Sequence, residues 1–155
     1  MIVLVMGVAG VGKTTIGEAL ARALGARFID ADDYHPPENV AKMKAGVSLQ
    51  DADRWPWLQR LNEILKDEKK AVLACSALKE TYRRHLAEGI ADFRIVYLHG
   101  SAGLIRERMK VRRHRYMPAA LLDSQLATLE APTHAIAIDV AAPLEASVAA
   151  IVERL

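Results

Sequence analysis

The sequence lacks the features that mark several large classes of protein. Cys75 is the only cysteine among 155 residues, which excludes an internal disulfide and fits a reducing, cytoplasmic location. The formal net charge is only +2, too small by itself to indicate a nucleic-acid or membrane surface. No apolar run is long enough to span a membrane, and we expect no signal peptide, because the apolar N-terminus lacks a basic region.

The composition and patterning that remain predict one α/β domain over residues 1–155. Hydrophobic residues make up 52% of the chain, which excludes a disordered protein and permits a sizeable core. Short apolar runs predict strands at residues 2–6, 26–29, 71–75, 94–98 and 135–140. Helical spacing predicts helices at residues 15–24, 54–66, 78–86, 102–112, 118–129 and 143–155. This alternation predicts a five-stranded parallel sheet with helices on both faces and ligands beyond the carboxyl ends of its strands.

The turn between the first strand and the first helix fits G-x-x-x-x-G-K-[ST], the phosphate-binding loop. Its glycines allow backbone N–H groups to point at an anion, and the helix dipole adds to that field. We expect Lys13 to reach the β- and γ-phosphates of ATP and Thr14 to ligate Mg²⁺. A glycine-rich turn with an incidental lysine is the alternative. The expected nucleotide-binding residues here are Gly7, Val8, Ala9, Gly10, Val11, Gly12, Lys13, Thr14 and Thr15.

Carboxylates and a histidine follow the second predicted strand. Asp32 is the candidate for accepting the proton of a substrate hydroxyl or orienting it for in-line attack. The alternative is a solvated acidic turn in which Asp30 or Asp33 caps the next segment. His35 either hydrogen-bonds substrate or fixes the loop before two prolines.

Polar and cationic residues follow the third predicted strand. Ser76 either donates to a phosphate or substrate oxygen or caps the following helix. Lys79 and Arg83 are four residues apart, so both could point into one cleft, or form an exposed cationic face. This strand does not end in the aspartate that holds Mg²⁺ in motor ATPases and switch GTPases. Its absence favours small-molecule kinases whose carboxylate follows the second strand.

Two further cationic features are candidates for the site. Arg54 either clamps an acidic substrate or pairs with Asp51 or Asp53, and Asp53 is expected to cap the following helix. Trp57 is expected in the core rather than the site. The arginine-rich segment 106–115 predicts a lid that closes over the transferring phosphate, with a solvated helix end as the alternative. It lacks interleaved aromatics beyond Tyr116, so RNA binding ranks last.

Several longer motifs add a resemblance to one family. With the phosphate loop, they make the chain resemble the gluconate kinases over essentially its whole length. The motifs are Asp30-Ala31-Asp32-Asp33-Tyr34-His35-Pro36, Asp51-Ala52-Asp53-Arg54-Trp55-Pro56-Trp57-Leu58, Cys75-Ser76-Ala77-Leu78-Lys79 and Ser124-Gln125-Leu126-Ala127-Thr128-Leu129-Glu130.

The resemblance implies an activity and a set of roles. Such enzymes use ATP and Mg²⁺ to phosphorylate D-gluconate at its 6-hydroxyl, and they are commonly cytoplasmic homodimers. It implies a helical substrate insert at about 36–46 and a lid at about 112–118. Asp32 would face the 6-hydroxyl. The residues that would contact the sugar acid are Asp32, His35, Arg54, Ser76, Lys79 and Arg83.

The resemblance is weakest at the predicted lid and the adenine site. The family lid usually has Arg-x-Gly-His-Phe, whereas this chain has Arg112-Arg113-His114-Arg115-Tyr116, so the role of the usual histidine does not carry over. Arg112 and Arg115 are the catalytic candidates of this segment, and Arg108 is expected beside adenine, opposite residues 139–143. Open alternatives are a kinase of another small polyol acid, such as shikimate, and a non-catalytic ATP-binding module.

Overall fold

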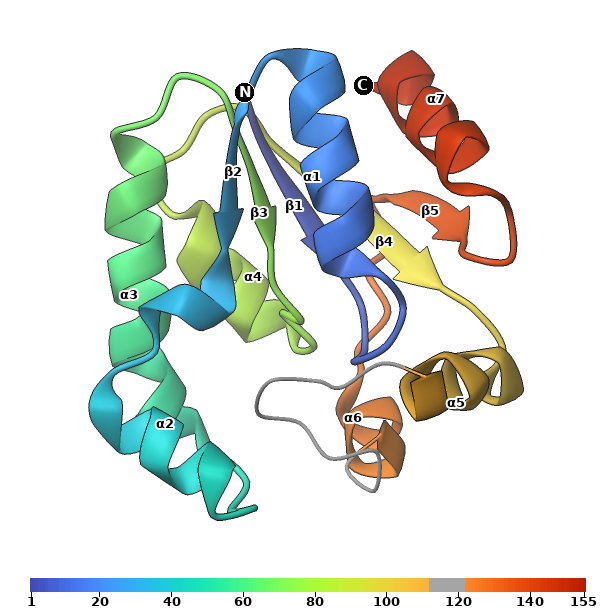
Figure 1. Cartoon of the computed structure of the whole chain (residues 1–155). Coiled ribbons are helices and arrows are strands. Elements are labelled where there is room, and N and C mark those ends of the chain that lie inside the picture. The colour runs from blue at the N-terminus through green and yellow to red at the C-terminus, as the bar shows by residue number, and fades with distance from the viewer. Residues whose placement is uncertain (112–121) are drawn as a thin grey trace.

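The structure, a computed structural model, describes residues 1–111 and 122–155 (Figure 1). The predicted lid at 112–118, with the candidates Arg112 and Arg115, lies outside the described residues. None of the helices in the described ranges has the length and apolar character needed to cross a bilayer.

A five-stranded parallel sheet forms the centre of the molecule, as the sequence predicts. Its strands are β1 (Ile2–Met6), β2 (Arg27–Asp30), β3 (Ala71–Ala74), β4 (Phe93–His99) and β5 (Ile136–Asp139). Their order across the sheet is β2-β3-β1-β4-β5, and every neighbouring pair is parallel. Because β1 is central, the loop that follows it lies at the middle of the carboxyl edge.

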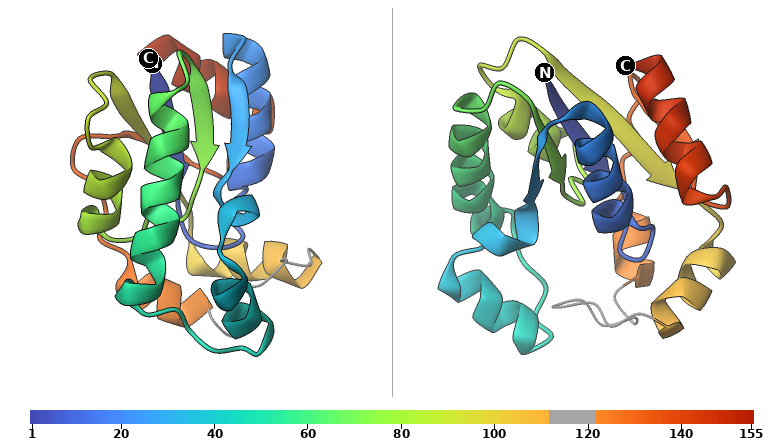
Figure 2. Two further views of the ribbon diagram at one scale, coloured as in Figure 1. Left: turned by 90° about the vertical axis from the view of Figure 1, so that its left-hand side faces the viewer. Right: turned by 45° about the horizontal axis from the view of Figure 1, so that its top comes forward.

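Helices connect the strands and pack on both faces of the sheet. They are α1 (Lys13–Leu24), α2 (Pro37–Lys44), α3 (Asp51–Lys66), α4 (Glu80–Ala87), α5 (Ala102–Val111), α6 (Leu122–Thr128) and α7 (Leu144–Arg154), with a 3-10 turn η1 (Ala31–Tyr34) after β2. Figures 1 and 2 show α1 and α7 on one side of the sheet and α3 and α4 on the other.

Alternation along β1 divides the core into two halves. Val3 and Val5 pack with the cluster that includes α1 and α7, while Ile2, Leu4 and Met6 pack with the cluster that includes α3 and α4. All five side chains are buried, as the continuous apolar run of a central parallel strand requires. Burial on both faces fixes the register of β1 and therefore the position of the loop after it.

Two helix starts differ from the expectations. Helix α3 begins at Asp51 with Gln50 as its N-cap, so the prediction that Asp53 caps this helix is wrong. Asp53 instead takes the third position of a capping box, where its carboxylate accepts the Gln50 N–H at 2.8 Å. Helix α4 begins at Glu80 with Lys79 as its N-cap, so Ser76 does not cap it.

The carboxyl edge of the sheet faces the shorter helices. In Figure 1 the strands point down toward α2, α5 and α6, while both chain termini lie at the opposite end. The loops after β1, β2 and β3 therefore meet in one region, which contains several of the predicted site residues.

Candidate active site

The loop after β1 has the backbone geometry of an anion-binding turn. Gly12 adopts φ 97° and ψ 29°, a left-handed conformation, and serves as the N-cap of α1. Gly10 also has a positive φ of 87°, and a Cβ placed on it would lie 2.6 Å from Met109 Cγ of α5. Both positions therefore require glycine, one for its conformation and the other also for the close approach of α5.

Lys13 begins α1 and turns back over the loop. Its Nζ donates to Val8 O at 3.0 Å, and burial lowers the pKa of its ammonium group. The carboxylates of Asp32 and Asp30 oppose that shift by favouring the charged form. Lys13 therefore lies within electrostatic reach of the acidic turn after β2, so the loops after β1 and β2 share one electrostatic environment.

A cavity of about 480 Å³ lies on the α5 side of the loop and matches the predicted adenine region. Gly10, Gly12 and Thr15 form one wall, and Arg108 lies on the opposite wall with Val140. Arg108 Nη2 donates to Val140 O at 2.6 Å, which fixes the guanidinium beside the loop after β5. The structure thus brings Arg108 and the residue range 139–143 together, as expected.

The residues around the phosphate loop can supply oxygen ligands to a divalent cation. Thr14 is exposed in the first turn of α1, and the carboxylates of Asp30 and Asp32 lie near Lys13. Hydroxyl and carboxylate oxygens suit Mg²⁺, which usually keeps several waters and binds through one or two side chains plus substrate phosphates. Among residues 1–111 and 122–155 no three acidic, histidine or cysteine side chains form a metal cage. The donor set therefore fits a magnesium ion held jointly with a nucleotide.

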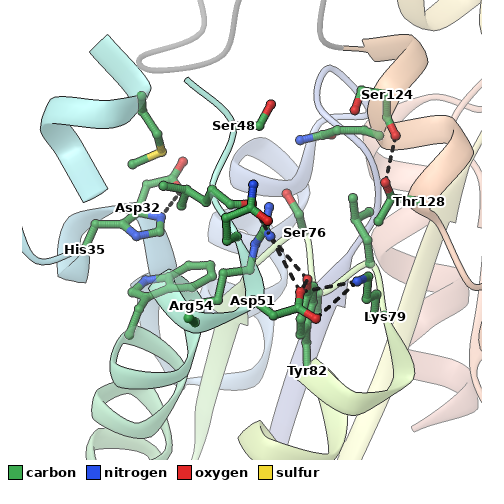
Figure 3. A pocket seen from close by; sticks show the side chains of 18 of the residues that line it. Asp32, His35, Ser48, Asp51, Arg54, Ser76, Lys79, Tyr82, Ser124 and Thr128 are labelled. Carbon is green, nitrogen blue, oxygen red and sulfur yellow. Dashed lines mark hydrogen bonds and ion pairs between the residues drawn. The ribbon is translucent and has the colours of Figure 1, made fainter. Parts of the chain in front are cut away.

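A second cavity, of about 560 Å³, lies on the other side of the loop (Figure 3). Its wall is formed by η1, the end of α2 and the loop that follows it, the start of α3, the loop after β3, the start of α4, and α6. The predicted site residues that line it are Asp32, His35, Arg54, Ser76 and Lys79.

Asp32 and His35 form one end of this second cavity. Asp30 caps η1 by accepting the Asp32 N–H at 3.0 Å, and the Asp32 side chain remains 55% exposed. His35 Nε2 lies 3.7 Å from Asp32 Oδ1, while the imidazole stacks on Trp57 with ring centroids 4.0 Å apart. Burial, and then the nearby charge of Arg54, lower the pKa of His35 to about 4. A neutral, packed imidazole thus fixes the loop and lines the cavity, beside an accessible carboxylate.

Trp57 combines the predicted core position with a place in the cavity wall. Its side chain is buried, and its Nε1 donates to Ala31 O at 2.8 Å. That hydrogen bond ties α3 to η1, so the stacking partner of His35 is itself held in place.

A charged cluster forms the opposite end of the cavity. Asp51 accepts from Lys79 Nζ at 3.2 Å and from the Tyr82 hydroxyl. Those two hydrogen bonds lower the pKa of Asp51, and the Asp51 carboxylate in turn raises the pKa of Lys79. Arg54 Nη1 donates to Leu49 O at 2.8 Å and to the Tyr82 hydroxyl at 3.2 Å. Arg54 is therefore held in the cavity wall, and its predicted pairing with Asp51 is also present at 4.0 Å.

The structure does not bring Arg83 to the cavity, contrary to the expectation of a shared face with Lys79. Lys79 is the N-cap of α4 and projects into the cavity, whereas Arg83 is buried on the inner side of the helix. Its guanidinium donates to three backbone carbonyls, those of Ala77, Leu78 and Glu130. A guanidinium engaged in this way supports the loop rather than contacting a ligand in the cavity.

Asp51, Tyr82 and Gln125 are among the residues that line the cavity and were not predicted as site residues. Asp51 and Tyr82 carried a usable signal, because both stand within three residues of a predicted site residue on the same helix. Gln125 carried no such signal, since its contact with Ala9 joins positions 116 residues apart.

Known proteins provide an independent comparison. The sequence profile described as "Shikimate kinase" matches residues 9–136. A curated relative from Xenopus tropicalis, "Probable gluconokinase", is 47% identical, covering 90% of this chain and 85% of that protein. The crystal structure of a gluconokinase from Sinorhizobium meliloti 1021 is 46% identical, with a TM-score of 0.87, covering 96% of this chain and 87% of that one.

The shikimate kinase of Bacteroides thetaiotaomicron is more distant. It is 18% identical, with a TM-score of 0.71, covering 99% of this chain and 97% of that one, so it shares the fold alone. The identity to gluconokinases is 46–47%, against 18% to this shikimate kinase. The chain therefore belongs to the gluconokinase family of P-loop kinases.

Proposed function

We propose that this protein transfers the γ-phosphoryl group of ATP to the 6-hydroxyl of D-gluconate, giving 6-phospho-D-gluconate and ADP. The observation that carries the proposal is the position of Asp32. Its carboxylate is half-exposed in the wall of the second cavity, here called the sugar cavity, and within electrostatic reach of Lys13 in the phosphate loop. A carboxylate at that boundary can act on an alcohol held on one side and a phosphate held on the other.

The sugar cavity has the side chains needed to bind a hydroxylated acid. Arg54 can bind a carboxylate through its planar donors, and Lys79 adds a second cation. Ser76, Asp51 and Tyr82 supply hydroxyl and carboxylate groups that can exchange hydrogen bonds with sugar hydroxyls. A volume of about 560 Å³ accommodates a six-carbon acid with ordered water.

The phosphate loop would hold the donor nucleotide. Gly12 is the N-cap of α1, so the N–H groups of the first helical turn lie at the loop, and Lys13 supplies the positive charge expected beside the β- and γ-phosphates. Thr14 would contribute its hydroxyl to Mg²⁺, which when bound would neutralise charge on the phosphate oxygens. Arg108 and the cavity beside it would receive the adenine end.

The reaction is an in-line displacement at the γ-phosphorus. The 6-hydroxyl oxygen forms a bond to phosphorus while the bond from phosphorus to the bridging β–γ oxygen breaks, releasing ADP. Asp32 accepts the proton of that hydroxyl, and Lys13 offsets the negative charge carried by the phosphate oxygens. Arg112 and Arg115 are proposed to add guanidinium groups to the same phosphate, on the basis of the predicted lid.

A coupled assay for ADP release, run with a panel of polyol acids, tests the proposal. We expect kcat/KM for D-gluconate to exceed that for shikimate and other sugar acids by at least about 100-fold. Phosphorus NMR of the product should place the phosphate on the terminal carbon. Preference for another acid would replace the substrate, and tight ATP binding without transfer to any polyol would favour a non-catalytic module.

Three further properties are proposed from the family resemblance. They are dependence on Mg²⁺, assembly as a homodimer and a cytoplasmic location. Chelation with EDTA should abolish turnover, and added Mg²⁺ should restore it. Sedimentation velocity should give a species of twice the 17.0 kDa chain mass at micromolar protein.

A further inference from the structure

The loop between β3 and α4 is held in an unfavourable backbone conformation. Ala77 has φ 44°, and it is the one non-glycine residue with positive φ within residues 1–111 and 122–155. Ala77 is buried, and the nearby side chains of Ser76 and Lys79 line the sugar cavity. Some other part of the protein must hold this loop in place, because an alanine does not adopt that conformation by its own preference.

Arg83 and Glu130 provide that support. Arg83 is only 5% exposed, and its guanidinium donates to Ala77 O at 2.7 Å, Leu78 O at 3.2 Å and Glu130 O at 2.8 Å. The Glu130 N–H donates to Leu78 O at 2.8 Å, and the Glu130 carboxylate accepts the Glu80 N–H at 2.8 Å. Glu130 therefore joins the loop through both its backbone and its side chain, although it is remote in sequence.

The same segment contacts the phosphate loop at its other end. Glu130 follows α6 by two residues, and Gln125 lies within α6. Gln125 Oε1 accepts the N–H of Ala9 at 2.7 Å, at the tip of the phosphate loop. A backbone N–H only donates, so the side-chain oxygen of Gln125 is the atom that faces the loop.

We propose that residues 125–130 form a brace that couples the phosphate loop to the β3–α4 loop. Gln125 is a positioning residue that acts on Ala9, while Glu130 and Arg83 are positioning residues that act on Ser76 and Lys79. The brace rests on the proposed function and deepens it, because it sets the separation between the phosphoryl donor and the sugar acid. A ligand that moves the Ala9 amide thereby displaces the wall of the sugar cavity.

Amide hydrogen exchange with peptide mass analysis tests the sugar end without requiring turnover. Glu130→Ala removes the acceptor of the Glu80 N–H, and Glu130→Gln keeps one; the residue is exposed, so both variants should fold. In Glu130→Ala we expect exchange in residues 76–83 to accelerate about fivefold, the factor for one lost hydrogen bond. Glu130→Gln should restore the wild-type rate, and Glu88→Ala, an exposed control at the C-terminal end of α4, should match wild type.

The coupling itself requires a ligand. With Mg²⁺ and the analogue AMPPNP, exchange in residues 76–83 of wild type should slow about threefold, although that loop lies across the cavity from the nucleotide. Gln125→Met has similar size but offers Ala9 no strong acceptor, and it should lose this response while still binding AMPPNP. A response that persists in Gln125→Met, or unchanged exchange in Glu130→Ala, would overturn the brace.

Steady-state kinetics then separate the brace from the proposed function. Glu130→Ala should raise the KM for gluconate about fivefold and leave the KM for ATP unchanged, with rescue by Glu130→Gln. If wild-type protein does not phosphorylate gluconate but the exchange results hold, the proposed substrate fails and the brace stands. If gluconate is phosphorylated and exchange does not respond, the brace fails alone.

Discussion

The phosphate loop binds mainly through its backbone, whereas the sugar cavity binds through side chains. The phosphate side is made of consecutive residues, with backbone N–H groups, three positive-φ glycines and one lysine. The sugar side is made of side chains from several separate helices and loops, joined by hydrogen bonds. Specificity for phosphate is therefore set by backbone shape, while specificity for the acceptor depends on individual side chains and changes more easily.

The two sides also differ in charge. Near the phosphate loop, Lys13 is half-buried and lies within electrostatic reach of the acidic turn after β2. Within residues 1–111 and 122–155, the charged side chains that line the sugar cavity are two anions, Asp32 and Asp51, and two cations, Arg54 and Lys79. A balanced cavity attracts an organic anion weakly over distance, so recognition there must rely on directed hydrogen bonds. Substitutions on the phosphate side and on the sugar side should therefore change different kinetic constants.

The largest effect is expected at the boundary of the two sides. Asp32→Asn keeps the shape of the side chain but cannot accept the substrate proton, so kcat should fall about a thousandfold. The melting temperature should stay within a few degrees of wild type, because the carboxylate is half-exposed. Stopped assays of ADP release would measure the loss.

Asp33→Asn is the matched control for Asp32→Asn. Asp33 is the next residue in the same turn, is exposed, and does not line the cavity. It should retain kcat within about twofold of wild type. Equal losses in the two variants would mean that the charge of the turn matters and that Asp32 is not the proton acceptor.

On the phosphate side, Lys13→Ala should lower kcat by about a hundredfold or more, since it removes the one charged donor of the loop. The KM for ATP should rise as well, while the KM for gluconate should change little. Lys69→Ala, on the exposed turn before β3, is a control that should match wild type. A variant with normal kcat and only a raised KM for ATP would restrict Lys13 to nucleotide binding.

The sheet and the phosphate loop could be predicted because their signals are local. Apolar runs located all five strands to within two residues, and the loop motif lies between a strand and a helix as its pattern requires. Helix ends were less predictable. Asp53 is a favoured N-cap residue type and Gln50 is not, yet Gln50 is the N-cap and Asp53 takes the third helical position of the capping box.

The sugar cavity could be predicted only in part because its contacts are distant in sequence. Spacing alone placed Lys79 and Arg83 on one face, yet Lys79 is a helix cap and Arg83 turns inward to three carbonyls. The carbonyl of Glu130 that receives Arg83 is 47 residues away, and no local pattern indicates it. Family motifs contained Asp51 and Gln125, but a motif does not say which side chain faces the cavity.

The buried imidazole at one end of the sugar cavity predicts a pH-dependent stability. The pKa of His35 is about 4 in the folded protein, against 6.5 for an ordinary histidine in the unfolded chain. The unfolded state therefore binds more protons between those values, and stability falls as the pH falls through that range. The free energy of unfolding should be about 2 kcal/mol smaller at pH 5 than at pH 7 from this group.

Urea unfolding at pH 7 and pH 5 checks this effect of His35. His35→Phe keeps a ring against Trp57 but does not titrate, so its loss of stability between the two pH values should be smaller by that amount. His85→Phe, the same substitution at an exposed histidine outside the cavity, is the matched control. If wild type and His35→Phe lose the same unfolding free energy between pH 7 and pH 5, the fold does not keep the imidazole neutral.

The smallest effect is expected from a change of geometry at constant charge on the sugar side. Arg54→Lys leaves the cavity with two anions and two cations but removes the planar pair of donors that suits a carboxylate. The KM for gluconate should rise about tenfold, with the KM for ATP unchanged. Arg60→Lys, an exposed residue beside Tyr34 that does not line the cavity, should alter neither constant. If the KM for gluconate of Arg54→Lys matches wild type while that of Arg54→Ala does not, the positive charge alone recognises the acid. Directed hydrogen bonds would then not distinguish the sugar side from the phosphate side.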